Sequence, residues 1–427
     1  MESHGLGVKT VYEIYNRKGG ELIYSNENNK VGKAEVQIKI NNPGQSERII
    51  TFPFRSYVSN FSRVLQYGLL AIDNSTAGAA IDKIIKTTTG GATYAAAEIQ
   101  TMAVNEIALT GAAQTAYGIW IGDIDNLSGH GLTLEAGIGG SVAYNDYMLR
   151  GLLLANGGTP DTDINYLATN VTFSNSDNTL TVSRRFQNVS ATIDTKITEI
   201  GLVGKSGTDY FLLARDRVTD GTNAYFLLSM GGTVEVSYIF TITDILGFTQ
   251  NYLKMLSSEF LGANALSQVR DINNVAQTIN FSSARTQKDL LAAATSDLYG
   301  ILVGYQTGVF NTSAGTNTPY TVNTQSYNIG SKISHGVIVN TLYHGVVTAV
   351  VMEQTLNKTT FGLYRDFENQ YTSLQVPINN SGLVIRQGTS PYTYYLIATD
   401  YVPSIGNYLQ VAPNQVLRVK YIFEAPL

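Results

Sequence analysis

The pentapeptide VSYIF occupies Val236–Phe240, and a near copy, VKYIF, occupies Val419–Phe423. Apolar and polar residues alternate through the first copy and its flanks, Thr233–Ile242, which predicts a β-strand with one buried face. The second copy has the same alternation over Val416–Ala425. A strand sequence that occurs twice predicts an internal repeat, and each copy is expected to be the last strand of one repeated unit.

The similarity extends upstream of both copies. When Tyr210–Phe240 is laid over Tyr394–Phe423 with a one-residue gap, identical residues recur in the same order. They are Tyr210/Tyr394, Leu212/Leu396, Ala214/Ala398, Asp216/Asp400, Val218/Val402, Asn223/Asn407, Tyr225/Tyr408 and Val236/Val419. Three further pairs keep this order: Ala116–Gly122 with Leu298–Gly304, Thr198–Gly204 with Thr359–Arg365, and Phe54–Leu65 with Phe248–Phe260. We infer a tandem duplication.

The repeat divides the chain into three parts. Residues 1–30 are polar and Gly-rich and are interpreted as an N-terminal arm or an extra hairpin, before a strand at Ala34–Ile40. Residues 31–244 form unit one and residues 245–427 form unit two, each sandwich-like. Unit two also contains an apparent insertion, residues 366–391, where new function would be expected. The predicted fold class is mainly β, with a few inserted helices.

Helices are predicted where the apolar spacing changes. In NYLKMLSSEFL, Asn251–Leu261, apolar residues recur at steps of four. TQKDLLAAATSDL, Thr286–Leu298, opens with a plausible N-cap. A third stretch, Ala95–Leu109, is rich in helix formers. In contrast, Asn170–Asn188 reads as two strands around SNSDN, whose side chains favour a turn.

Composition narrows the class of function. Among the 427 residues, 44% are hydrophobic and only 14% are charged, against about 25% charged in typical soluble domains. This favours wide contacts with other subunits, although weakly charged β-proteins also look like this. The net charge is −5, without a basic block, which argues against nucleic-acid binding. There is no cysteine, no secretory signal and no long apolar run, so a soluble protein is expected.

No catalytic, cofactor-binding or metal-binding residue is predicted. The histidines His4, His130, His335 and His344 lack metal-ligand spacing. A nucleophile elbow and a P-loop are absent, and the glycines of Ala136–Asn145 do not fit a dinucleotide site. A glycosidase site remains an alternative, because a sequence does not show whether two carboxylates meet at a cleft.

Arg215 and Asp216 are neighbours in a strand-like run, so they are expected on opposite faces. Asp216 recurs as Asp400 and is interpreted as a turn cap rather than a catalytic group. The loops Leu154–Asn165 and Thr307–Asn328 are interpreted as surface loops, with contact between subunits as the alternative. The segment SPYTYY, Ser390–Tyr395, is the candidate for stacking on a sugar.

Four motifs in Thr179–Ile242 together carry a resemblance: RRFQN (Arg184–Asn188), ITEIGLVG (Ile197–Gly204), LLARD (Leu212–Asp216) and GGTVEVSYIFTI (Gly231–Ile242). This stretch resembles a β-module of virion proteins of tailed bacteriophages, in which the first motif is an Arg-aromatic-x-Asn turn. The likeness reaches unit two only through the repeat, where Phe361 replaces Ile200 and Thr399 replaces Arg215.

The resemblance implies a virion protein that assembles in the host cytoplasm and forms symmetric rings or trimers. We therefore expect a non-enzymatic structural component, a homo-oligomeric ring or tube in the tail or neck. Its expected partners are itself and other phage structural proteins, without sequence-specific nucleic-acid contact or membrane insertion. The alternatives are a capsid decoration or head-fibre protein, a receptor- or glycan-binding module, and a carbohydrate-active enzyme.

Overall fold

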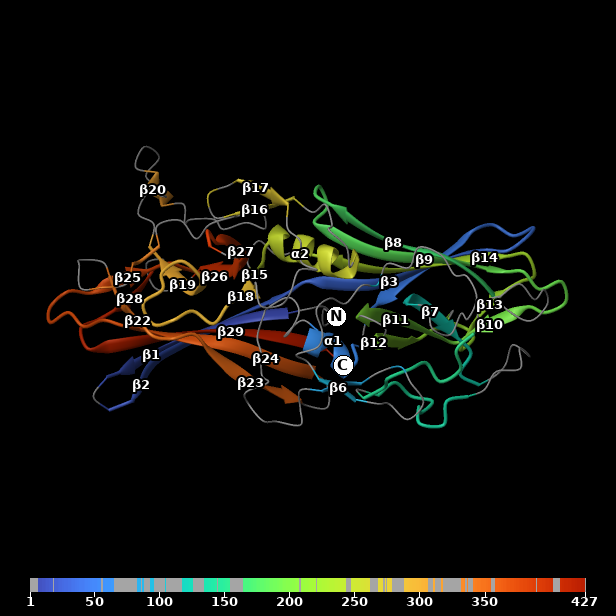
Figure 1. Ribbon diagram of the computed structural model, residues 1–427, viewed down its shortest axis with the longest axis horizontal. Helices are drawn as coiled ribbons and strands as arrows, with labels where there is room; N and C mark the ends of the chain where they lie inside the picture. The colour runs from blue at the N-terminus through green and yellow to red at the C-terminus, as the bar shows by residue number, and fades with distance from the viewer. Residues whose placement is uncertain are drawn as a thin grey trace.

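The mainly β fold class is confirmed by the computed structural model (Figure 1). Its described residues are 7–17, 19–54, 57–64, 83–85, 87, 93–95, 104, 117–125, 134–143, 145–153, 164–206, 209–219, 221–242, 247–261, 268–271, 273, 275–278, 288–305, 310–311, 316–317, 332–334, 336, 341–354, 358–388, 390–401 and 408–426. Neither of the two helices found in these ranges is long and apolar enough to cross a membrane.

Unit one occupies the right half of Figure 1 and consists of two antiparallel sheets that enclose apolar side chains. The larger sheet has the order β4-β3-β14-β9-β8, and the smaller has the order β12-β11-β7, with the pair β10-β13 beside them. Their bounds are β3 (Lys33–Asn41), β4 (Arg48–Pro53), β7 (Gly118–Gly122), β8 (Ile164–Ser174), β9 (Thr179–Asn188), β10 (Thr195–Ile197), β11 (Glu199–Ser206), β12 (Asp209–Arg217), β13 (Phe226–Leu228) and β14 (Thr233–Thr241).

Unit two occupies the left half and has the same plan. Its larger sheet has the order β2-β1-β29-β24-β22, with β23 also on β24, and its smaller sheet joins β15, β27 and β26 to β18 and β19, with the pair β25-β28. The bounds are β1 (Gly7–Asn16), β2 (Leu22–Val31), β15 (Gly247–Phe248), β18 (Lys288–Asp289), β19 (Gly300–Gly304), β22 (Tyr343–His344), β23 (Thr348–Gln354), β24 (Lys358–Glu368), β25 (Val376–Ile378), β26 (Asn380–Gln387), β27 (Thr393–Tyr401), β28 (Leu409–Val411) and β29 (Gln415–Pro426).

The described part of the chain also holds three short hairpins: β5 (Lys83–Ile85) with β6 (Thr93–Ala95), β16 (Gln268–Arg270) with β17 (Ala276–Thr278), and β20 (Phe310–Asn311) with β21 (Thr316–Asn317). The predicted hairpin at Asn170–Asn188 is present as β8 and β9, with Asn178 in the turn at a φ of 50°. An asparagine tolerates this left-handed conformation better than most residues do.

The two repeated strands, β14 and β29, occupy the same place in their units. β14 lies between β3 and β9, and Val236 pairs with Ile38. β29 lies between β1 and β24, and Val419 pairs with Tyr12. The matched pairs of AYGIWIG and LYGILVG also agree, since β7 pairs with β11 as β19 pairs with β26. The registers of the two units thus correspond strand by strand.

Of the two interpretations of residues 1–30, the hairpin is confirmed and the arm is wrong. β1 and β2 form a hairpin, and β1 pairs with β29 along its whole length, from Gly7 opposite Glu424 to Asn16 opposite Gln415. The hairpin is therefore the counterpart in unit two of β3–β4. Every second side chain of β1 enters the core of unit two, and Tyr12 is fully buried there.

Unit two is consequently assembled from two distant parts of the chain. Its first hairpin comes from residues 7–31 and its remaining strands come from residues 247–426. Unit one lies between them in sequence, and Gly32 alone separates β2 of one unit from β3 of the other. Both chain ends lie near the middle of the elongated molecule, where the two units meet (Figure 1).

The predicted insertion at residues 366–391 is also wrong. This segment contains the end of β24, then β25 and β26. Pro377 of β25 pairs with Gln410, just as Lys196 of β10 pairs with Leu227. The segment is therefore the counterpart of the end of β9 with β10 and β11, and it belongs to the repeated unit.

The error came from one misaligned pair of segments. Thr198–Gly204 corresponds to 379–385 and not to Thr359–Arg365, because Gly201 pairs with Arg215 and Gly382 pairs with Thr399. Both ladders also have a register shift at the equivalent place, after Leu202 in β11 and after Leu383 in β26. The counterpart of Ile200 is therefore Ser381 rather than Phe361.

Buried arginines link the two sheets of each unit. Arg184 of β9 and Arg365 of β24 stand opposite the equivalent valines of β14 and β29, and both are buried. Each donates through Nε to a loop or edge-strand carbonyl oxygen and through Nη1 to the facing sheet. The acceptors are Leu167 (2.8 Å) and Ile119 (3.2 Å) in unit one, and Gly345 (2.8 Å) and Ile301 (3.0 Å) in unit two.

Buried asparagines occupy the ends of the same two strands. The Nδ2 of Asn188 donates to the carbonyl oxygens of Ile193 and Leu228, while that of Asn369 donates to those of Leu374 and Val411. RRFQN is thus the end of strand β9 rather than a turn. Its counterpart is RDFEN, residues 365–369, which the sequence comparison missed.

Each unit has one described helix: α1 (Ser59–Val64) in unit one and α2 (Gln250–Leu261) in unit two. The side-chain amides of Asn60 and Asn251 each donate to a strand carbonyl oxygen, of Leu212 and Leu396 respectively. α2 confirms the prediction for Asn251–Leu261. α1 also lies against β24, and α2 lies against β9, so each helix contacts the opposite unit reciprocally.

The predicted helix at Thr286–Leu298 is wrong for its described residues. Lys288 and Asp289 form β18, and a turn follows at residues 294–295. The Nη2 of Arg365 donates hydrogen bonds to the carbonyl oxygens of Ala293 and Ser296, at 3.1 and 2.6 Å. A helix would use such carbonyl groups internally. The third predicted helix, at Ala95–Leu109, lies outside the described residues except Ala95, which ends β6, and Val104.

Candidate functional site

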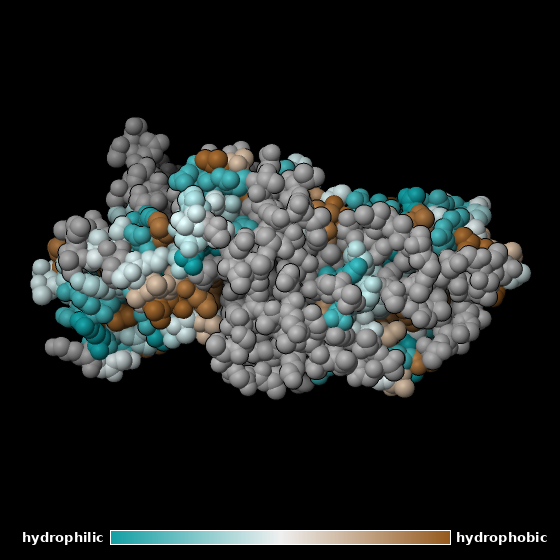
Figure 2. Space-filling model, viewed as in Figure 1, coloured by the Kyte–Doolittle hydropathy of each residue, from teal (hydrophilic) through white to brown (hydrophobic). Residues whose placement is uncertain are grey.

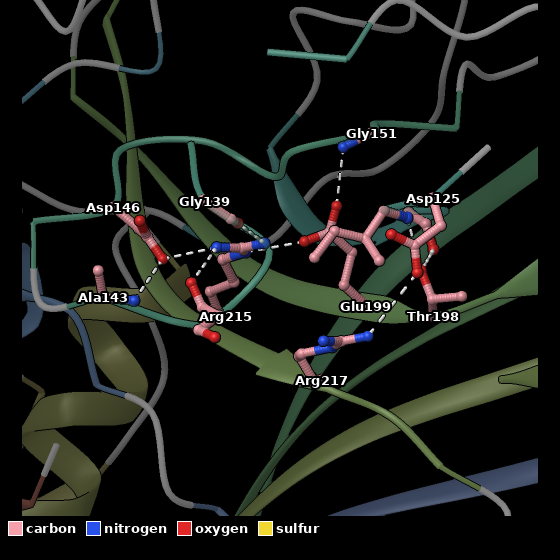
Figure 3. Close-up of polar contacts among 12 residues, drawn as sticks. Asp125, Gly139, Ala143, Asp146, Gly151, Thr198, Glu199, Arg215 and Arg217 are labelled. Carbon is pink, nitrogen blue, oxygen red and sulfur yellow. Dashed lines mark hydrogen bonds and ion pairs between the residues drawn. The ribbon is translucent and has the colours of Figure 1, made fainter. Parts of the chain in front are cut away.

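Among the described residues, the most concentrated group of buried charge lies on the outer side of the smaller sheet of unit one, around Arg215 (Figure 3). Arg215 projects from β12. Its Nε donates to Oε2 of Glu199 on β11 at 2.8 Å, and its Nη1 donates to Oδ2 of Asp146 at 2.7 Å. Arg215 pairs with Gly201 and therefore lies diagonally across the ladder from Glu199, while Asp146 comes from a segment 69 residues upstream of Arg215. We call these three residues the charged cluster.

The charged cluster holds the segment 134–153 against the sheet. Arg215 also donates to the carbonyl oxygens of Gly139 (3.1 Å) and Ser141 (3.3 Å). The other oxygen of Glu199, Oε1, accepts a hydrogen bond from the backbone N–H of Gly151 at 2.8 Å. Figure 3 shows Asp146 and Glu199 on opposite sides of the Arg215 guanidinium group.

Glycine allows this close approach. A Cβ at Gly151 would lie 2.2 Å from the carbonyl oxygen of Asp123, and a Cβ at Gly122 would lie 2.9 Å from the carbonyl oxygen of Gly151. Either contact would push the segment away from the sheet, because real side chains do not approach backbone so closely. The two glycines therefore permit the distances on which the ion pairs depend.

The charged cluster is closed to solvent. The side chains of Arg215 and Glu199 are 0% exposed, and that of Asp146 is 5% exposed. Burial raises the pKa of Glu199, and the guanidinium of Arg215 opposes this rise. Satisfied hydrogen bonds compensate for much of the cost of burying these charges. A buried, fully engaged arrangement of this kind suits a structural brace better than a catalytic site, which must reach its substrate.

Unit two lacks the counterpart of this brace. Asn380 stands in place of Glu199, and Thr399 stands in place of Arg215. Thr399 donates instead to the carbonyl oxygen of Ser381 at 3.0 Å. The charged cluster therefore distinguishes the two units, although their strands correspond.

Asp216 and Asp400 lie on the opposite face from the charged cluster, as alternation predicted for Arg215 and Asp216. Both aspartates are buried, and Asp400 accepts a hydrogen bond from Nδ2 of Asn28 at 2.9 Å. Their interpretation as turn caps is wrong, because each lies within a paired strand rather than at a turn. Asn28 belongs to β2, so this bond ties the N-terminal hairpin to the rest of unit two.

The histidines form no site within the described ranges. His4, His130 and His335 lie outside them. His344 is buried in β22, with Nδ1 3.4 Å from the carbonyl oxygen of Ser296 and its ring against Phe367. No group of three or more potential metal ligands occurs among the residues whose positions are described.

The tyrosines of SPYTYY are divided between surface and core. Tyr395 is buried, whereas Tyr392 is 42% exposed. The guanidinium of Arg386 lies between the rings of Tyr392 and Tyr299, 4.5 and 4.3 Å from their centroids. One exposed ring thus remains available from this candidate. Of the two predicted surface loops, Leu154–Asn165 and Thr307–Asn328, only Ile164, Asn165, β20 and β21 lie in the described ranges.

Open sheet edges and exposed apolar side chains are the surfaces best suited to contact with other chains. β8 ends the larger sheet of unit one, carries no charged residue and pairs only with β9 among the described strands. Uncharged edges of this kind readily pair with another strand. Apolar patches are visible in Figure 2, and the largest on that face lies over unit two. The exposed large apolar residues include Leu22, Ile23, Ile49, Leu227, Met230, Val275, Val346 and Leu374.

No protein-family model, curated protein or solved structure matches the chain.

Proposed function

We propose that the chain is a non-enzymatic structural component of a tailed-phage particle and forms a homo-oligomeric ring or tube in the tail or neck. The observation that carries the proposal is the presence of two β-units with corresponding registers in one weakly charged chain. An oligomer of n such chains presents 2n similar units, which provides a route to matching two symmetries. The motifs in Thr179–Ile242 supply the link to phage virions.

The junction between the units supports this proposal. α1 of unit one lies against β24 of unit two, and α2 of unit two lies against the equivalent β9 of unit one. Such reciprocal contact is the arrangement of a twofold dimer, here within one chain. Because this surface is already used, the outer edges and ends of the units remain for contact with other subunits.

The charged cluster supports a non-enzymatic role. Its carboxylates are engaged by Arg215 and backbone N–H groups, and they are buried. An inverting or retaining glycosidase needs two carboxylates that face a bound sugar. A test for depolymerase activity on host envelopes separates the two classes, and activity there would contradict the proposal.

A capsid decoration or head-fibre protein is the alternative location for the same structural role. A receptor- or glycan-binding module is the second candidate, and the exposed ring of Tyr392 beside Arg386 is the observation that favours it. A glycan array tests it directly. A positive signal that disappears in the Tyr392→Ala variant would favour this second function.

Light scattering coupled to size-exclusion chromatography tests the leading proposal. We expect the purified chain to elute as a homo-oligomer with a defined copy number at micromolar concentration. A strict monomer over the whole accessible concentration range would contradict the proposed function.

A further inference from the structure

Unit two is incomplete without the N-terminal hairpin, β1–β2. In unit one the equivalent hairpin, β3–β4, is followed directly by the segment that leads into α1. In unit two, α2 follows the two-residue strand β15, and the hairpin lies more than 200 residues upstream. The hairpin is thus a separate piece that completes a distant part of the fold.

The contacts of the hairpin are made with unit two. β1 forms a continuous ten-pair ladder with β29. The hydroxyl of Tyr12 lies 2.8 Å from Oγ of Ser381, and Glu13 accepts from Nζ of Lys420 at 2.7 Å. With the bond from Asn28 to Asp400, these contacts fix both strands of the hairpin on a complementary surface.

The covalent link between the hairpin and unit one is short. Gly32 is the only residue between the end of β2 and the start of β3, and these strands belong to different sheets. A change in direction at Gly32 would move the hairpin as a body, which separates β1 from β29 but leaves the β1–β2 and β3–β4 pairs intact. Glycine has the widest range of backbone conformations for such a change.

We propose that in the assembled oligomer the β1–β2 hairpin of one copy completes unit two of a neighbouring copy. This inference rests on the proposed function, because it requires an oligomer. The same ladder and side-chain contacts form within one chain or between two, so the choice depends on the effective concentration of the donor hairpin. Neighbouring copies held in a ring raise that concentration.

Donation from each copy to the next has a definite structural consequence. A head-to-tail exchange is a heterologous contact, which closes into a ring when the rotation permits and otherwise extends as a helical tube. Each subunit would then be held by a complete β-ladder with buried side chains. Dissociation would require unpairing β1 from β29 in the adjacent copy.

The chain contains no cysteine, so engineered thiols test this proposal without background. Lys9 and Ile422 are partners in the β1–β29 ladder, and Glu35 and Ile239 are their equivalents in the β3–β14 ladder. We would purify the Lys9→Cys/Ile422→Cys variant and the matched control Glu35→Cys/Ile239→Cys as oligomers. Both would be treated with a short bismaleimide cross-linker and separated on a denaturing gel.

We expect the Lys9→Cys/Ile422→Cys oligomer to give a ladder of covalently linked chains, whereas the Glu35→Cys/Ile239→Cys control gives cross-linked monomers. A co-expressed mixture of Lys9→Cys and Ile422→Cys chains should give covalent dimers that contain one chain of each kind. Cross-linked monomers alone, from a preparation that light scattering shows to be oligomeric, would overturn the exchange and leave the proposed function standing. A monomer by light scattering would overturn both.

Discussion

Replacing Arg215 with methionine tests the role assigned to the charged cluster. The substitution keeps much of the side-chain length but leaves Glu199 and Asp146 buried without their guanidinium partner. It also removes the donors for the carbonyl oxygens of Gly139 and Ser141. The segment 134–153 should therefore lose its attachment to the sheet, and unit one should be destabilised.

The expected loss is about 3–5 kcal/mol, the usual cost of removing one partner from a buried ion pair. This is large beside the roughly 5–15 kcal/mol by which domains are stable. The triple variant Arg215→Met/Glu199→Gln/Asp146→Asn removes the buried carboxylates as well. Its new amide oxygens can still accept from backbone N–H groups, so it should recover most of the loss.

Urea unfolding followed by tryptophan fluorescence measures this effect in unit one. The single tryptophan of the chain, Trp120, is buried in β7 and pairs with Gly201 of β11. It therefore reports on the sheet that carries Arg215 and Glu199. A loss below about 1 kcal/mol for Arg215→Met, or a triple variant no more stable than the single one, would refute the brace.

The same variant has a predicted dependence on pH. Burial raises the pKa of Glu199 in the folded protein above its ordinary value of 4.5, and removing Arg215 raises it further. The folded state then binds a proton more readily than the unfolded state. The associated stability is fully present below pH 4.5 and is lost as the pH rises through the folded pKa. The difference in free energy of unfolding between Arg215→Met and the unaltered chain should therefore become smaller in acid.

Three further predictions concern the hairpin and the buried asparagines. Removing residues 1–31 should expose the edge of β29, which hydrogen exchange would detect as lost protection and light scattering as aggregation. Asn188→Ala should lower the free energy of unfolding by about 1–3 kcal/mol or more, because two buried carbonyl groups lose their donor. It should therefore lower the urea midpoint detected by tryptophan fluorescence, whereas Asn369→Ala should leave that midpoint unchanged. Burial opposes ionisation of Glu13, but its hydrogen bond from Lys420 and its other partners outweigh this effect and lower its pKa. The stability that the ionised Glu13 contributes is present above the ordinary carboxyl pKa and is lost as the pH falls through the folded pKa. Glu13→Gln should therefore weaken the acid dependence of unfolding.

Each of these predictions has a contrary outcome. Full exchange protection of β29 after the truncation would mean that the hairpin is dispensable for unit two. Equal effects of Asn188→Ala and Asn369→Ala on tryptophan fluorescence would mean that the two units do not unfold separately. An unchanged acid profile in Glu13→Gln would mean that its pairing with Lys420 adds nothing to stability.

The elements that the sequence predicted well are those whose signal is local. The closing strands β14 and β29 alternate clearly, α2 has its apolar residues at helical spacing, and the β8–β9 turn has the residues that turns need. Each pattern reflects burial within one continuous segment. These elements were sufficient for the mainly β class and for the repeat.

The errors arose where structure depends on distant partners. β2 is rich in Asn and charge, and its place in a sheet depends on β1 pairing with β29 some 400 residues away. The apparent insertion arose because Glu199 and Ile200 differ from their counterparts Asn380 and Ser381, which hid the similarity of β11 and β26. A helix-like pattern at Thr286–Leu298 was overridden by tertiary hydrogen bonds.

The charged cluster could be predicted only in part. LLARD drew attention to Arg215, and alternation gave its face correctly. Its partners were not identifiable, because Glu199 and Asp146 are separated from it by 16 and 69 residues. The signal that could have linked Glu199 to Arg215 is their position in adjacent strands of a hairpin. Nothing comparable in the sequence points to Asp146.

Electron microscopy of the purified chain is the sharpest test of the proposed assembly. We expect closed rings or tubes with rotational symmetry, in which every chain contributes two similar elongated lobes. Class averages that show only isolated two-lobed particles at concentrations where the protein is fully folded would contradict it.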